Sequence, residues 1–63
     1  MEKRLLDADE LSDYLSLPKA TIYTWTHLKK IPHLKLGRAV RFDRAEIDRW
    51  VEARRIGATP LAQ

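Results

Sequence analysis

The chain has 63 residues, no cysteine and a formal net charge of +3 at pH 7. A chain of this length forms at most one domain that buries roughly 60% of its unfolded surface, which leaves little room for an enclosed enzyme cleft. Without cysteine it has neither disulfides nor thiolate metal sites, and no apolar run approaches the ~18 residues of a membrane span. We therefore expect a soluble protein that is not an enzyme, needs no cofactor and contacts no membrane.

The charges are segregated along the chain. Residues 18–42 contain six lysines and arginines, both histidines and no aspartate or glutamate. Residues 1–17 carry a net charge of −3, and residues 43–63 carry none. A basic segment between an acidic and a neutral one is what a polyanion-binding surface needs, although clusters of this size also arise on ordinary solvated faces.

The first helix is predicted at about residues 8–15. Asp7 can cap its start and Glu10 stands at the third helical position, which is the pattern of a capping box. Apolar residues at i, i+3 and i+4 predict one buried face, formed by Leu11, Tyr14 and Leu15.

The second helix is predicted at about residues 18–29, behind a tight turn, with Pro18 at its first position. Neither Leu17 nor Pro18 offers a side-chain oxygen as a cap, so the first amide donors are left for solvent or for a ligand phosphate. Ile22 and Trp25 lie on the side assigned to the core. The opposite side carries mostly hydrogen-bonding side chains of moderate length, which is typical of a face that contacts another molecule: Ala20, Tyr23, Thr24 and His27.

A β-hairpin is predicted at residues 33–42. Apolar residues alternate with cations on both sides of a loop that contains Gly37. The apolar side chains, Leu34, Leu36, Val40 and Phe42, are expected to face the core. Three cations are expected to point outward: Lys35, Arg38 and Arg41.

The third helix repeats the start signal of the first, with Asp43 as the cap and Glu46 at the third helical position. Its core face is predicted to comprise Ile47, Trp50 and Val51. The helix is expected to reach about Arg55, with Gly57 as a stop. We expect residues 1–57 to form a single domain and residues 58–63 to form a flexible C-terminal tail.

The predicted order α-α-β-β-α describes a mostly α-helical fold with a small β-hairpin, the winged helix-turn-helix. In such a module the second helix enters the major groove of DNA and its outer side chains reach base edges. The wing, residues 33–42, would hold phosphates, and Arg38 at its tip would reach the backbone or an adjacent minor groove. The expected DNA contacts are therefore Lys19, Ala20, Tyr23, Thr24, His27, Lys35, Arg38 and Arg41.

The order of these motifs is also familiar. Excisionase-like and MerR-like DNA-binding domains open on a pattern that is similar to Leu11-Ser12-Asp13-Tyr14-Leu15-Ser16-Leu17-Pro18-Lys19-Ala20-Thr21-Ile22-Tyr23. Their wing and last helix resemble Ile31-Pro32, Leu36-Gly37-Arg38, Val40-Arg41-Phe42 and Ile47-Asp48-Arg49-Trp50. The resemblance covers about residues 5–51. It implies binding of double-stranded DNA in site-specific recombination or transcriptional control, with contacts at Lys19, Thr21, Tyr23, Thr24 and Arg38.

The chain departs from that pattern at three places. Pro18 stands where a serine or threonine cap is common. Thr24 and Thr26 stand where a basic and an aliphatic residue are common. Leu28-Lys29 replaces a frequent acidic-glycine pair before the first strand of the hairpin.

A second interpretation is a protein–protein adaptor that contacts a recombinase, polymerase or repressor through Leu28 and the acidic face of the first helix. His27 and His33 lie six residues apart without cysteine, so no zinc site is expected. No dimerisation helix is visible, and we expect a monomer in solution that assembles side by side on DNA. The localisation that follows is cytoplasmic and nucleoid-associated. The sequence does not separate a recombination directionality factor from a transcriptional regulator.

Overall fold

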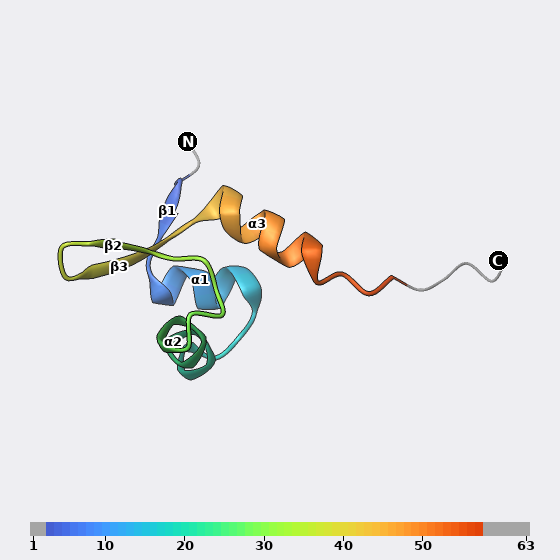
Figure 1. The fold of residues 1–63 in the computed structure, drawn as a ribbon, viewed down its shortest axis with the longest axis horizontal. Coiled ribbons are helices and arrows are strands. Elements are labelled where there is room, and N and C mark those ends of the chain that lie inside the picture. Colours follow the sequence, from blue (N-terminus) through green and yellow to red (C-terminus); the bar gives the residue numbers. More distant parts are fainter. Residues whose placement is uncertain (1–2, 58–63) are drawn as a thin grey trace, which may run out of the picture.

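The computed structural model describes residues 3–57, and these form three helices and a three-stranded antiparallel sheet. In chain order the elements are β1 (Leu5–Leu6), α1 (Ala8–Leu15), α2 (Lys19–His27), β2 (Leu34–Leu36), β3 (Ala39–Asp43) and α3 (Arg44–Ala53). The strand order is β1-β3-β2. The β2–β3 hairpin and α3 extend in opposite directions from the centre of the molecule (Figure 1). The winged helix fold is confirmed, with β1 as an element that the sequence did not predict.

One small core joins all the elements except β2. Its buried side chains come from β1, α1, α2, β3, α3 and the segment before β2, and they are Leu6, Leu11, Ile22, Ile31, Phe42 and Ile47. Half-buried side chains pack around them, among them Trp25 of α2 and Trp50 of α3. Ile31 is only 2% exposed, although the sequence indicated only that its segment ends the second helix. The core therefore fixes α2 against α1 and the sheet.

The two predicted helix caps, at α1 and at α3, make different contacts. At α1 the Asp7 side chain accepts from the Glu10 amide at 2.8 Å, and the Glu10 side chain accepts from the Asp7 amide at 2.9 Å, which confirms the capping box. At α3 the Asp43 side chain accepts from the Ala45 amide at 3.0 Å and from the Arg4 guanidinium at 3.0 Å. Asp43 therefore ties the chain before β1 to the start of α3.

Both α1 and α2 end at a non-glycine residue in the left-handed region. Ser16 has a φ of 56° and Lys29 a φ of 59°. After α2 the Lys30 amide donates to the Trp25 carbonyl at 2.8 Å and the Lys29 amide to the Thr26 carbonyl at 3.1 Å, which is a Schellman motif. Glycine is favoured at such a position, which explains why it is common there in the domains that the sequence resembles. Lys29 holds the same conformation in this chain.

The hairpin turn has only two residues between the paired Leu36 and Ala39. Gly37 is the first of them, with a φ of +66°, and Arg38 is the second. Glycine in a left-handed conformation at this position is typical of a type II′ turn, whose twist matches that of the flanking strands. The turn places Arg38 at the tip of the wing.

Three predicted core residues are exposed instead. Tyr14 is 45% exposed, and its hydroxyl donates to Asp48 of α3 rather than facing the core. Leu36 is 54% exposed because it lies beside the hairpin turn, away from the core. Val51 is 36% exposed and is not among the side chains that pack against the core, although its neighbour Trp50 is.

Smaller differences concern the ends of helices and one cation. α2 spans Lys19–His27 with Pro18 as its N-cap rather than its first residue, and α3 ends at Ala53 rather than at Arg55. Arg41 is half-buried rather than outward, because its guanidinium turns back and donates to the Val40 carbonyl at 2.8 Å. The predicted tail, residues 58–63, lies outside the described residues.

Candidate nucleic-acid interface

The two sides of α2 have different chemistry. Ile22 is fully buried, whereas Tyr23, the next residue, is 58% exposed. Ala20, Thr24 and His27 are exposed as well. At 100° per residue these four share one side of the helix. We call this set, Ala20, Tyr23, Thr24 and His27, the outer face of α2.

A hollow of about 560 Å³ separates the outer face of α2 from the wing. It is lined by side chains of three elements and their edges: Tyr23, Thr26 and His27 of α2, residues 38–42 of the hairpin, and residues 7–9 at the start of α1. The hollow brings together four of the predicted DNA contacts, Tyr23, His27, Arg38 and Arg41. This concave surface thus combines an aromatic ring and an imidazole with two guanidinium groups. Such a surface suits a ligand that carries many negative charges and stacked rings.

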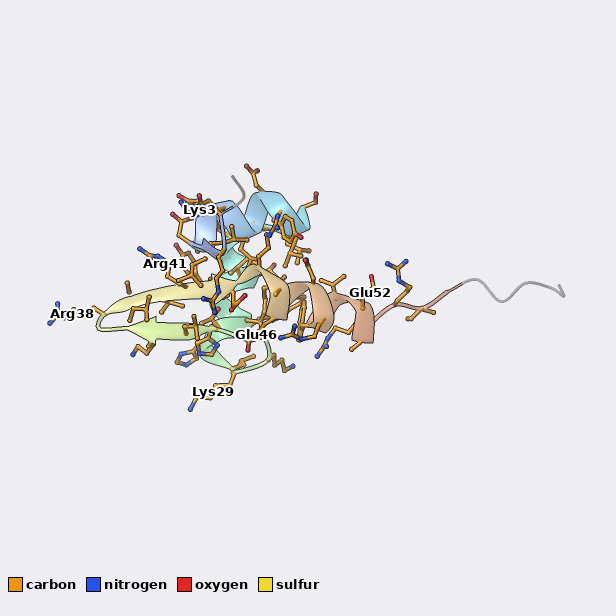
Figure 2. All side chains as sticks on the ribbon, turned by 90° about the horizontal axis from the view of Figure 1, so that it is seen from above. Lys3, Lys29, Arg38, Arg41, Glu46 and Glu52 are labelled. Atoms are coloured by element: carbon orange, nitrogen blue, oxygen red, sulfur yellow. The ribbon has the colours of Figure 1, made fainter. Side chains whose placement is uncertain are left out.

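The three wing cations are placed differently. Arg38 lies at the hairpin tip and points away from the rest of the molecule, as Figure 2 shows. Arg41 turns toward the side of α1 and lines the hollow. Lys35 is exposed on β2, opposite Val40, and does not line the hollow. The wing therefore offers two cations that line the hollow, Arg38 at the tip and Arg41, and one cation, Lys35, outside it.

The start of α2 carries the remaining predicted contacts. Pro18 provides no side-chain cap, as predicted. Lys19 is exposed, and its Nζ lies 2.7 Å from Oδ1 of Asp9 in α1. The hydrogen bond that Lys19 donates to Asp9 raises the pKa of Lys19 above its usual value. Thr21 is half-buried, and its amide donates to the Pro18 carbonyl at 3.0 Å.

Three polar side chains that line the hollow were not among the predicted contacts: Asp7, Asp9 and Thr26. Thr26 lies on the same side of α2 as Ile22, but it is only half-buried, and its hydroxyl donates to the Ile22 carbonyl at 2.7 Å. An aliphatic residue is common at this position in the domains that the sequence resembles. The threonine in its place indicated a less buried position. The two aspartates reach the hollow only through the packing of α1 on α2, for which the sequence holds no local signal.

A second, mainly apolar groove lies on the other side of α2. It is lined by Leu15, Leu17, Trp25, Trp50, Val51, Arg54 and Arg55. The two indole rings have centroids 5.8 Å apart and planes tilted by 58°. The Arg54 guanidinium lies 4.2 Å from the centroid of the Trp50 ring and stacks on it. The groove therefore differs from the hollow in being mainly apolar and in being flanked by α3 instead of the wing.

The histidines show no metal chemistry in the described part of the chain. His33 Nδ1 lies 2.8 Å from the Ile31 carbonyl oxygen, within hydrogen-bond distance. Among residues 3–57 no three histidine, cysteine or acidic side chains come together as metal ligands do. No helix within that range has the length and apolar character needed to cross a membrane.

Comparison with protein families gives one result that bears on this surface. A family model described as a helix-turn-helix domain matches residues 5–55, which is most of the chain. Comparisons with curated proteins and with solved structures gave no match.

Proposed function

This chain belongs to the helix-turn-helix family of DNA-binding domains, and on that premise we propose that it binds double-stranded DNA with α2 in the major groove and the β2–β3 hairpin as a basic wing. The nine residues of α2 span about 14 Å at ~1.5 Å per residue. The diameter of the helix with side chains is about 10–12 Å, which the ~12 Å wide major groove admits. The helix can therefore present its outer face to base edges.

The observation that carries the proposal is the hollow between the outer face of α2 and the wing. Tyr23 and His27 face Arg38 and Arg41 across it, and all four side chains come from the acid-free segment 18–42. When α2 lies in the groove, the flanking sugar-phosphate backbone passes along this concave surface. Arg38 and Arg41 hold phosphates there, whereas the outer face of α2 reads the bases.

The outer face of α2 offers modest base readout. Thr24 and His27 can donate to or accept from base edges, and Ala20 can pack on a thymine methyl. No arginine stands on this face to form a bidentate contact with guanine, and none of its residues is asparagine or glutamine. Sequence preference thus depends on small contacts and on Arg38, which reaches the backbone or a neighbouring minor groove.

Within this family we propose a small excisionase-like factor that acts in site-specific recombination or in transcriptional control. The protein is a monomer in solution and assembles side by side on its DNA site. The resemblance of residues 11–23 and of the wing to excisionase-like domains supports this role, and the adjoining genes decide between recombination and transcription.

Chemical-shift mapping with a mixed-sequence duplex tests the proposal. Backbone amides of residues 19–27 and of the wing should move. The indole N–H groups of Trp25 and Trp50 report on the apolar groove, and Trp50 Nε1 donates to the Lys30 carbonyl at 3.0 Å. They should move little. Shifts that gather at these indoles while the wing amides stay in place would contradict a DNA-binding surface formed by α2 and the wing.

A further inference from the structure

An ion pair joins the first turn of α1 to the first residue of α2. Lys19 Nζ lies 2.7 Å from Asp9 Oδ1, and both side chains are more than half exposed. Asp9 also lines the hollow that holds Tyr23, His27, Arg38 and Arg41. An acidic side chain thus occupies the position from which Lys19 would contact a DNA phosphate.

We infer that Asp9 competes with the DNA backbone for Lys19 and thereby lowers the affinity of the protein for DNA. The inference rests on the proposed function, because it assumes that α2 and the wing form the DNA-binding surface. The carboxylate of Asp9 therefore weakens DNA binding. DNA binding requires Lys19 to leave a carboxylate and to bind a phosphate.

The electrostatics of the hollow support this role. Asp7 and Asp9 are the acidic side chains that line it, and they come from α1, outside the acid-free segment. Asp7 is engaged in the capping box, where it accepts from the Glu10 amide. Asp9 has no such role in the cap, so its charge can be removed without loss of the capping box. Phosphates entering the hollow meet both carboxylates within about a Debye length, roughly 10 Å at 0.1 M salt.

The expected size of the effect follows from the exposure of the pair. Exposed ion pairs contribute little to stability, so the release of Lys19 should strengthen binding by about fivefold or less. The salt dependence gives a second readout. Lys19 contacts one phosphate in the complex of either protein, so the slope of log K against log salt should stay nearly the same while the affinity rises.

The test compares Asp9→Asn with Asp13→Asn by titration of a mixed-sequence duplex at several salt concentrations. Both substitutions remove one negative charge from α1, but Asp13 is exposed and does not line the hollow. We expect Asp9→Asn to raise affinity several-fold more than Asp13→Asn does. Thermal melts followed by circular dichroism check that both variants fold.

A Lys19→Met background shows whether the effect passes through Lys19. In that background the advantage of Asp9→Asn over Asp13→Asn should shrink to the part that comes from direct repulsion between Asp9 and the phosphates. Equal effects of the two substitutions in the wild-type background, or weaker binding by Asp9→Asn, would overturn the inference while the proposed function stands. Absence of binding by the wild-type protein would instead remove the proposed function itself.

Discussion

The two sides of α2 show how one nine-residue helix serves two purposes. On one side Ile22 is fully buried and Trp25 packs against Trp50 of α3, so this side decides where the helix lies. On the other side Tyr23 and His27 are exposed and face the wing across the hollow. The buried side therefore sets the distance between the outer face and the wing. Substitutions on the two sides should appear in different measurements, stability for one and DNA affinity for the other.

The largest effect is expected from Ile22→Ala. The side chain is fully buried, and truncation of a buried isoleucine leaves a cavity and costs about 2–5 kcal/mol. A domain of this size has little stability to lose, so a large fraction of the variant should be unfolded at 25 °C. Urea unfolding followed by circular dichroism measures the loss.

Tyr23→Ala is the matched control on the opposite side of the same turn. It should change the free energy of unfolding by about 0.5 kcal/mol or less, because surface substitutions rarely do more. It should nevertheless weaken duplex binding. If Tyr23→Ala unfolded as readily as Ile22→Ala, the outer face of α2 would be part of the core. The proposed difference between the two sides of α2 would then be wrong.

Arg38→Ala should reduce duplex affinity by about fivefold, and the slope of log K against log salt should fall by about 1. Its melting temperature should not change, because Arg38 is exposed at the wing tip. Arg49→Ala removes the same charge from an exposed position on α3 and serves as the control. Equal losses of affinity in the two variants would mean that net charge, and not the wing, determines binding.

Lys29→Gly should raise the stability of the domain while it leaves duplex affinity nearly unchanged. Lys29 lies beside Trp25 and Trp50 and holds a left-handed φ of 59°, so glycine should stabilise the domain by about 1 kcal/mol. Duplex affinity should fall by less than about twofold, because the lost charge is on the Trp25 side of α2. Ser16→Gly, at the equivalent position after α1, should give a similar gain without a change of charge. A loss of affinity as large as that of Arg38→Ala would extend the DNA interface to the Trp25 side.

The smallest effect concerns a contact remote from both sides of α2. The hydrogen bond from Arg4 holds the pKa of Asp43 below its usual value. Its folded pKa is therefore below its unfolded pKa, so the ionised carboxylate stabilises the fold above about pH 4, and that stabilisation is lost as the pH falls through the folded pKa. Asp43→Asn should lower the melting temperature at about pH 7, and the difference from wild type should shrink at about pH 3.

Asparagine caps helices as well as aspartate does, so this substitution isolates the Arg4 contact. Arg4→Met removes the other partner and should reproduce the same pH dependence. A difference between Asp43→Asn and wild type that is the same at both pH values would contradict the assignment. DNA affinity at neutral pH should remain near that of wild type in both variants, since neither residue lines the hollow.

The sequence predicted those features that depend on residues close together in the chain. The capping box at Asp7 gave the first helix its bounds, Ala8–Leu15, because the cap and its partner Glu10 lie within one turn. Gly37 and the alternation around it predicted the hairpin in the same way. The outer face of α2 followed from helical periodicity alone, which is reliable once a helix has one buried residue such as Ile22.

Contacts between distant segments determine the features that the sequence did not predict. β1 exists because Leu5 and Leu6 pair with Asp43 and Phe42, a match that no local pattern indicates. Tyr14 follows the spacing of a buried residue, yet it lies at the edge where α3 brings Asp48. The hollow itself depends on how α1, α2 and the wing pack, so the place of Asp9 beside Lys19 could only be found in the structure.

A fluorescence-anisotropy titration of a mixed-sequence duplex at low and at physiological salt tests the central claim most directly. Six cations in residues 18–42 can neutralise at most about six phosphates, so the account predicts clear binding at low salt and a steep loss of affinity as salt rises. Absence of binding at low salt, or affinity that does not change with salt, would contradict a DNA-binding surface formed by α2 and the wing.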